Sequence, residues 1–288
     1  MNKILDDYYI EKNLGSGSFG DVYLVIDKKT KEKWAAKVED KKKSYRLVDE
    51  YKIYKRMHRK GYGYGLPKIH DFIETPKFNI LLMELLSDNL DKLFVDSRKK
   101  FNLETVLLLG VSITELLEKM HNMGYIHRDI KPNNFMVGFG NNRNKIFIMD
   151  LGLAKRYVHD GKHISMRTDK SLTGTARYVS TNVHMGFEPS RRDDLISVGY
   201  MLVYFLKGSL PWQGIRKDKK KPNHMDIGEA KLATNLDKLC KDTPECFKHY
   251  LHYCKNLMFD QKPDYKYLKS LFVETAQKMR INLKYEWS

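Results

Sequence analysis

The chain has 288 residues, of which 42% are hydrophobic and 31% are charged. This balance is typical of a folded globular protein and excludes an intrinsically disordered chain. The 52 Lys and Arg residues outnumber the 36 Asp and Glu residues, which gives a formal net charge of +16. Such an excess predicts an anionic partner: a nucleotide, a phosphopeptide, an acidic protein or a nucleic acid.

The sequence also indicates where the protein works. No apolar run approaches the roughly 18 residues that a membrane helix needs, so we expect no membrane partner. The segment Met1–Asp7 carries acidic residues where a signal peptide would be apolar. The three cysteines, Cys240, Cys246 and Cys254, form no Cys-x-x-Cys pair, which is typical of reduced thiols. These features predict a cytoplasmic protein, a nuclear protein, or one found in both compartments.

The first part of the chain has the pattern of a β-sheet. Residues 8 to 86 alternate between apolar and polar side chains and are rich in β-formers, which predicts short antiparallel strands. One helix is expected over 45–58, where apolar residues recur at helical spacing. The expected strands lie at 8–10, 22–26, 33–38 and 78–83.

A glycine-rich motif, LGSGSFGDV, spans residues 14–22. Its glycines, Gly15, Gly17 and Gly20, let a backbone turn approach phosphate oxygens without Cβ atoms in the way. The strand expected at 22–26 excludes a Rossmann motif, and the absence of a following Gly-Lys-Ser/Thr excludes a Walker A loop. Taken alone, the motif is equally compatible with an ordinary Gly-rich hairpin.

Lys37 lies on the third expected strand, at the end of Trp34-Ala-Ala-Lys37. A lysine that projects from a rigid strand can bind the α- and β-phosphates of a nucleotide if an acidic residue holds it in place. Glu50 on the expected helix is the candidate, and Asp49 is the alternative. A solvated surface lysine is the competing interpretation.

After residue 87 the pattern becomes helical. Apolar residues three to four positions apart predict helices over 103–120 and 194–206. Strand-like pieces are expected between them at 135–137 and 146–149. The sequence therefore predicts the α+β class, with a small β-rich lobe followed by a larger, mainly helical lobe.

The most specific motif, YIHRDIKPNN, spans residues 125–134. Asp129 can accept the proton of a hydroxyl group, and Lys131 can offset the charge of a transferring phosphoryl group. Asn134 offers an amide oxygen to a metal ion, whereas His127 is expected to pack in the core. A fourth motif, Met-Asp-Leu-Gly, places Asp150 after an apolar strand as a hard oxygen ligand for Mg²⁺.

These four motifs occur in the order and spacing of the protein kinase signature set. Beyond that set, the chain closely resembles the casein kinase 1 family of Ser/Thr protein kinases from about residue 6 to 285. The resembling segments are KSLTGTARY at 170–178, SRRDDL at 190–195, GSLPWQG at 208–214, MELL at 83–86, STN at 180–182 and KPDY at 262–265.

The resemblance implies a two-lobed protein kinase fold. A single kinase domain over 1–288 is expected, with lobes at 1–86 and 87–288 and no regulatory C-terminal tail. The implied reaction transfers the γ-phosphate of ATP to Ser/Thr hydroxyls of acidic or already phosphorylated proteins. Mg²⁺ would be held by Asn134 and Asp150, and we expect a monomer.

The resemblance also implies roles for the residues around ATP. Lys37, held by Glu50, would bind the α- and β-phosphates beneath the glycine-rich loop. Asp129 would be the base for the substrate hydroxyl, Lys131 would offset the γ-phosphate charge, and Asp194 would brace the catalytic loop. The implied adenine pocket consists of Leu14, Val22, Ala35, Met83, Glu84, Leu86 and Met136.

A basic pocket for a substrate anion is implied as well. Lys170 and Arg177 match two of its positions, but its third basic position falls at Asn223. This departure puts strong dependence on a priming phosphate in question. The lysines at 219–221 could compensate, although an exposed lysine run is as often a solvated surface.

Three other functions are compatible with parts of the sequence. An ATP-binding pseudokinase scaffold would share the fold, but every residue that the chemistry requires is present. Nucleic-acid binding is compatible with the net charge, but the sequence contains no recognisable nucleic-acid-binding motif. Nucleic-acid binding is therefore not expected as the primary role. A small-molecule phosphotransferase is disfavoured by the full helical lobe and by the segment at 170–178.

Overall fold

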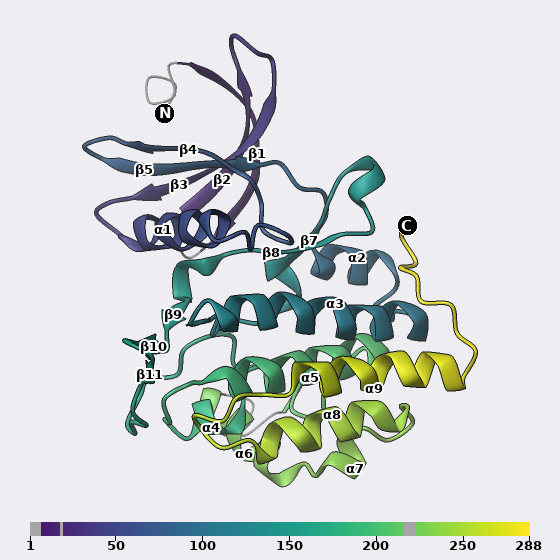
Figure 1. Ribbon diagram of the computed structural model, residues 1–288. Helices are drawn as coiled ribbons and strands as arrows, with labels where there is room; N and C mark the ends of the chain where they lie inside the picture. The colour runs from purple at the N-terminus through teal and green to yellow at the C-terminus, as the bar shows by residue number, and fades with distance from the viewer. Residues whose placement is uncertain (1–6, 18–19, 216–222) are drawn as a thin grey trace. The chain divides into compact units, whose positions relative to one another are not determined.

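The structure is a computed structural model that describes residues 7–17, 20–215 and 223–288 (Figure 1). The chain divides into two compact units. Unit 1 comprises Met1–Asp88 and Met136–Gly152, and unit 2 comprises Asn89–Phe135 and Leu153–Ser288.

Unit 1 is built on a five-stranded antiparallel sheet with the order β1-β2-β3-β5-β4. One helix, α1 (Arg46–Arg59), belongs to the same unit, as does the strand β8 (Ile146–Ile148). The short strand β7 (Phe135–Val137) pairs with β8. The strands of the large sheet are β1 (Tyr8–Gly17), β2 (Gly20–Asp27), β3 (Lys33–Asp40), β4 (Ile69–Glu74) and β5 (Phe78–Glu84).

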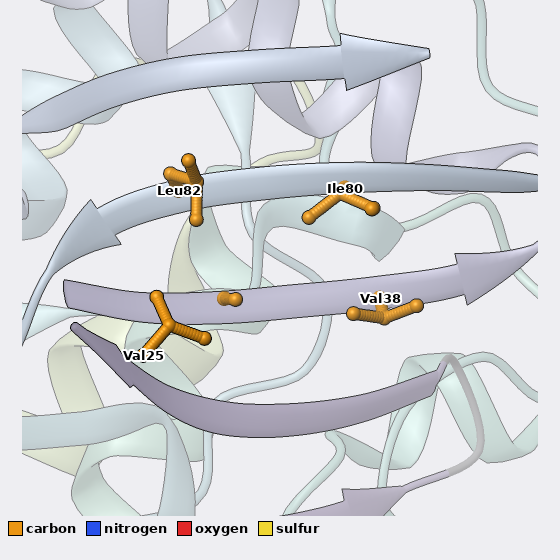
Figure 2. Packing of buried hydrophobic residues seen from close by; sticks show 5 residues of the cluster. Val25, Val38, Ile80 and Leu82 are labelled. Atoms are coloured by element: carbon orange, nitrogen blue, oxygen red, sulfur yellow. The ribbon is translucent and has the colours of Figure 1, made fainter. Parts of the chain in front are cut away.

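One face of this sheet carries a buried cluster (Figure 2). On β3, Ala36 and Val38 alternate with residues of the opposite face, and they pair with Leu82 and Ile80 of β5. Val25 of β2 completes the cluster. The side chains packed against it are the partly buried Tyr8, Ile10, Tyr23, Trp34, Ile73 and Phe78. Burial of this face leaves the other face of β3 to present Ala35 and Lys37.

Unit 2 is mainly helical. The helix α3 packs against α5 and α9, and α5 packs against α8. Gly110 of α3 and Gly199 of α5 allow these close approaches, because a Cβ atom at Gly110 would lie 2.6 Å from Phe272 and one at Gly199 would overlap Leu251. The helices are α2 (Leu90–Asp96), α3 (Leu103–Asn122), α4 (Thr181–His184), α5 (Arg191–Lys207), α6 (His224–Ala233), α7 (Leu236–Leu239), α8 (Glu245–Asn256) and α9 (Tyr265–Lys278).

Short ordered pieces connect these helices. The strand β6 (Tyr125–Ile126) pairs with β9 (Lys155–Arg156), and β10 (Val158–His159) pairs with β11 (Lys162–His163). Single 3₁₀ turns lie at Pro132–Asn134, Gly140–Asn142 and Leu151–Leu153. The β6–β9 pair fixes the start of the segment that carries the YIHRDIKPNN motif.

The observed elements agree with the predicted α+β class. The helices expected at 45–58, 103–120 and 194–206 correspond to α1, α3 and α5. The sequence did not predict β4 or the helices α2, α6, α7, α8 and α9. Within the part of the chain that the structure describes, no helix combines the length and the apolar character needed to cross a membrane.

Candidate active site

Lys37, the residue predicted to bind phosphates, meets Glu50 and Asp150 within unit 1. Its Nζ atom lies 2.7 Å from Oε2 of Glu50 and 2.9 Å from Oδ1 of Asp150. The alternation along β3 explains this position, because Lys37 faces away from the buried cluster that contains Ala36. The Lys37 side chain is only 13% exposed. One strand, one helix and the segment after β8 therefore place a cation between two carboxylates.

Glu50, and not the alternative Asp49, is the partner of Lys37. The Asp49 side chain is 78% exposed, and its Oδ1 atom lies 3.7 Å from Nζ of Lys52. Burial raises the pKa of the Glu50 carboxyl, and this effect outweighs the lowering of the pKa by the nearby Lys37. Burial also disfavours the charged form of Lys37, but Glu50 and Asp150 outweigh it and raise the pKa of this lysine. Lys37 is therefore held as a cation, the form that binds phosphate.

Asp150 is placed by the segment that follows β8. Its φ angle of 60° is left-handed, a conformation that Asp adopts more readily than most residues. The next residue, Leu151, is buried, and its backbone N–H donates to Oε1 of Glu50 over 3.3 Å. The Asp150 side chain remains 25% exposed. A carboxylate in this setting is the type of ligand that Mg²⁺ prefers.

The described residues of the glycine-rich motif lie at the end of β1 and the start of β2. Gly15 pairs with Val22, and Gly17 pairs with Gly20. Gly20 has a φ angle of 133°, and a Cβ atom there would overlap the carbonyl oxygen of Val38. Only glycine fits this position. The three glycines leave their backbone positions without a Cβ atom, as a phosphate-binding loop requires.

The residues predicted to surround adenine all belong to unit 1. Ala35 and Met83 are direct partners on β3 and β5, and both are buried. Val22 and Met136 are half-buried, whereas Leu14 is 42% exposed. These side chains are the apolar members of the predicted adenine site. The full set is Leu14, Val22, Ala35, Met83, Glu84, Leu86 and Met136.

The connector after β5 supplies polar groups of the backbone. The N–H of Glu84 donates to the carbonyl oxygen of Lys68 over 2.8 Å, and the N–H of Ser87 donates to that of Val137 over 2.9 Å. These two bonds fix the connector on either side of Leu86. Among the described residues, no hydrogen-bond partner occurs for the N–H or C=O of Leu86. Unpaired groups of a buried residue fit the hydrogen-bonding edge of a base.

In unit 2, three side chains converge on Asp129. Nζ of Lys131 donates to its Oδ2 atom over 2.6 Å, and Oγ1 of Thr175 donates to its Oδ1 atom over 2.7 Å. Nδ2 of Asn134 donates to the Asp129 carbonyl oxygen over 2.8 Å. Asp129 is only 4% exposed. These bonds hold its carboxylate in one orientation, which a positioned general base requires.

Asp194 holds the backbone of the same loop, in the bracing position that the family resemblance implied. Its carboxylate accepts hydrogen bonds from the N–H of His127 over 2.7 Å and from the N–H of Arg128 over 2.9 Å. Burial opposes ionisation of Asp194, but the hydrogen bond to the buried His121 and the electrostatic effects of His121 and His127 lower the pKa of this carboxyl. His127 is also buried, and its Nδ1 atom accepts from the N–H of Asp129. His127 therefore has the core position that we expected.

Asn134 and Asp150 suit a magnesium ion by their chemistry. The Nδ2 group of Asn134 donates to Asp129, so the side-chain oxygen is the atom left to act as a ligand. Asp150 contributes a carboxylate. Amide and carboxylate oxygens are the donors that Mg²⁺ selects. Asn134 belongs to unit 2 and Asp150 belongs to unit 1.

Thr175 is a site residue that the sequence analysis did not single out. It lies within the KSLTGTARY segment, and its hydroxyl reaches Asp129 across 46 positions of the chain. The only signal for it was its place in a segment that resembles a known family. The tertiary structure makes it a direct neighbour of the candidate base.

Arg177 lines a cavity of about 200 Å³ together with Trp212, Gln213, Gly214 and Ile227. The indole N–H of Trp212 donates to the carbonyl oxygen of Arg177 over 2.8 Å, which fixes the backbone at this position. The guanidinium lies 5.6 Å from the ring centre of Tyr204. A cation beside a small cavity is a suitable receptor for an anionic side chain.

Lys170 is not one of the described residues that line this cavity. Its Nζ atom lies 3.8 Å from Oε2 of Glu188, and Lys155 approaches the same carboxylate to 2.7 Å. Among the described contacts, Lys170 pairs with Glu188 and Arg177 lines the cavity beside Trp212, and a shared anion pocket for the two basic residues stays a prediction. Glu188 partly neutralises the charge that was predicted to receive a substrate anion.

Asn223, the predicted departure from the basic pocket, begins helix α6. Its side-chain oxygen accepts hydrogen bonds from the N–H groups of Met225 and Asp226. Asn is among the best residues for this capping role. The lysines at 219–221 lie outside the described residues.

A buried lysine beneath the Arg177 segment was also missed by the sequence analysis. Nζ of Lys231 donates to the carbonyl oxygens of Ala176 and Val179 over 2.7 and 2.6 Å. It also lies 3.2 Å from Nε2 of His184. Lys231 is 1% exposed. Its amine thus ties helix α6 to the backbone on both sides of Arg177.

The family model for the protein kinase domain matches residues 8–271. This span covers most of the 288 residues, and the chain belongs to the protein kinase family. Proteins of this class transfer a phosphoryl group from ATP to protein hydroxyls with the help of Mg²⁺.

Proposed function

We propose that the protein is a casein kinase 1-like Ser/Thr protein kinase. It transfers the γ-phosphate of ATP to hydroxyls of acidic or already phosphorylated proteins. We further propose that residues 1–288 form one kinase domain and that the protein acts as a monomer, in the cytoplasm, the nucleus or both. The observation that carries the proposal is the oriented carboxylate of Asp129, with Lys131 and Thr175 hydrogen-bonded to its two oxygens.

Asp129 is the base of the proposed reaction. Its carboxylate takes the proton of the substrate hydroxyl as the hydroxyl oxygen bonds to the γ-phosphorus, and the bond from that phosphorus to the β–γ bridging oxygen breaks to release ADP. Lys131 offsets the charge on the moving phosphoryl group. Little covalent chemistry is asked of the protein, because positioning and charge stabilisation lower most of the barrier.

Unit 1 supplies the proposed ATP-binding groups. Lys37 binds the α- and β-phosphates beneath Gly15, Gly17 and Gly20, and Glu50 keeps the lysine in place. The backbone of Glu84 and Leu86 bonds the adenine edge. Asn134 and Asp150 are the proposed ligands of Mg²⁺, which neutralises phosphate charge when bound.

The preference for acidic substrates rests on charge. The formal net charge of +16 favours encounters with anionic proteins, and Arg177 beside its cavity offers a receptor for one acidic or phosphorylated side chain. Lys170 forms an ion pair with Glu188, and the Asn223 side chain caps helix α6. We therefore propose that Arg177 contributes most to recognition of the anionic substrate side chain. We therefore propose a moderate, not absolute, dependence on a priming phosphate.

The test is phosphate transfer from labelled ATP with Mg²⁺ to three peptides. One is acidic, one carries a phosphoserine three residues before the target Ser, and one is neutral. We expect the primed and acidic peptides to react faster than the neutral one. Replacing Ser by Tyr in the acidic peptide tests the Ser/Thr preference.

Asp129→Asn and Asp150→Asn are the controls, and both should abolish transfer. ATP binding without transfer to any peptide would instead support the pseudokinase scaffold. Transfer only to a small-molecule acceptor would contradict the proposed substrate class. Equal rates for all three peptides would contradict the proposed role of Arg177.

A further inference from the structure

Helix α1, which carries Glu50, has no hydrogen bond from its N-cap side chain, although Oγ of the preceding Ser44 accepts from the N–H of Arg46 over 3.3 Å. Its N-cap residue is Tyr45, which makes no side-chain hydrogen bond to the first turn. The first backbone N–H groups of any helix lack partners within the helix and need acceptors from elsewhere.

Glu39 on β3 supplies those acceptors. Its Oε1 atom accepts from the N–H of Arg46 over 2.9 Å and from the N–H of Leu47 over 3.1 Å, and its Oε2 atom lies 3.2 Å from the latter. Nδ2 of Asn79 donates to Oε2 over 3.3 Å. Glu39 is 1% exposed. A carboxylate at a helix N-terminus is stabilised by the unpaired N–H groups and by the helix dipole.

Strand β3 contacts helix α1 through a second side chain, Lys37. Lys37 precedes Glu39 by two positions, so both side chains leave one face of β3. Lys37 holds Glu50, and Glu39 holds the N–H of Leu47, one turn earlier on α1. Two contacts from one strand fix both the axial position and the rotation of the helix.

We propose that Glu39 is a positioning residue for nucleotide binding: it fixes α1 so that Glu50 meets Lys37. This inference rests on the proposed role of Lys37 in binding ATP. Glu39 itself touches neither Lys37 nor Glu50 in the hydrogen bonds described for it, so it acts through the helix.

The first test compares Glu39→Gln with Asp49→Asn. The second variant removes a negative charge from the same first turn, but Asp49 is exposed and caps nothing. We expect Glu39→Gln to raise the KM for ATP about fivefold, a factor that corresponds to the free energy of one helix cap. The KM for the peptide should stay unchanged. Asp49→Asn should change neither. A lowered Tm with an unchanged KM for ATP, measured well below Tm, would overturn the proposal.

The second test measures coupling to Glu50 by direct ATP binding in an Asp129→Asn background. If Glu39 acts through Glu50, Glu39→Gln should weaken binding in the presence of Glu50 but add little to Glu50→Gln. Additive losses would overturn the inference. Should Glu39→Gln fail to fold, Glu39→Asp, which retains the charge on a shorter side chain, replaces it in the same cycle.

The two proposals fail in different ways. If the Asp129→Asn parent binds no ATP, the proposed function itself is wrong. If the parent binds ATP and the Glu39 variant binds it equally well, only the positioning role of Glu39 is wrong.

Discussion

The candidate base Asp129 owes its orientation to side chains from different parts of unit 2. Lys131 and Asn134 come from its own loop, and Thr175 comes from the segment that also carries Arg177. This arrangement links the base to the segment proposed to receive the substrate. A small change at Thr175 should therefore affect catalysis without affecting ATP binding.

Thr175→Val keeps the shape of the side chain and removes its hydroxyl donor. We expect kcat to fall about tenfold, because a hydrogen bond to a charged group contributes roughly 1.5–3 kcal/mol. The KM for ATP should stay unchanged. Thr173→Val is the matched control, since the Thr173 hydroxyl lies 3.5 Å from a backbone oxygen and does not reach Asp129. Steady-state kinetics measure kcat and the KM for ATP of both variants. Equal kcat values for Thr175→Val and Thr173→Val would contradict the role of Thr175.

His184 predicts a response to pH. Burial and then the nearby Lys231 lower the pKa of His184 to about 4, against 6.5 for an unperturbed histidine. Between these two values the unfolded chain binds a proton that the folded protein does not, so the free energy of unfolding should fall as pH falls from about 6.5 to about 4.

His184→Gln should make this decline shallower. Urea unfolding at pH 7.5, 6.0 and 5.0 measures it, with His249→Gln as control because His249 is 57% exposed. Identical pH slopes for His184→Gln and the unmodified protein would count against the assignment. The buried His121 contributes in the same direction, because burial lowers its pKa as well.

Among the helices, α5 and α8 show how closely packing is specified. Gly199 of α5 faces Leu251 of α8, and there is no room between them for a Cβ atom. The close approach lets α5 bury nearly all of its surface, as expected of a helix that is apolar on most sides. The catalytic loop depends on this helix because Asp194 lies in its first turn.

Gly199→Ala should lower the free energy of unfolding by about 1–3 kcal/mol through overpacking. Leu251→Ala should lower it by about 2–5 kcal/mol through a cavity. The double variant should lose less than the sum, because the smaller side chain makes room for the added methyl group. Chemical denaturation of the three variants measures the coupling. Strictly additive losses would show that the helices separate instead of clashing.

The charge of the protein as a whole should govern its encounters with substrate. With a net charge of +16, long-range attraction to an acidic peptide is screened as salt rises, since the Debye length shrinks to about 8 Å at 0.15 M. We expect the KM for the acidic peptide to rise about threefold between 50 and 300 mM NaCl. The KM for the neutral peptide should stay constant. A parallel rise for both peptides would point to a general salt effect.

Elements with clear periodicity were predictable. The helices at 45–58 and 103–120 agree with α1 and α3 because their apolar residues form one face. The edge strand β4 was missed because its half-buried and exposed positions do not alternate along Ile69–Glu74. Helix α6 was missed because its face toward the segment around Arg177 is built from Gly228 and Lys231 instead of large apolar residues.

The chemistry of the candidate site could be predicted from the sequence wherever its residues lie close together in the chain. The loop from Asp129 to Asn134 and the choice of an acid near the start of α1 could be inferred from spacing and residue type. Contacts between segments far apart in the chain could not be inferred from spacing and residue type. Lys37 meets Asp150 across 113 positions, and Thr175 meets Asp129 across 46. Such pairs form only when sheet and helices pack, because no local pattern encodes which distant side chain completes a buried hydrogen bond.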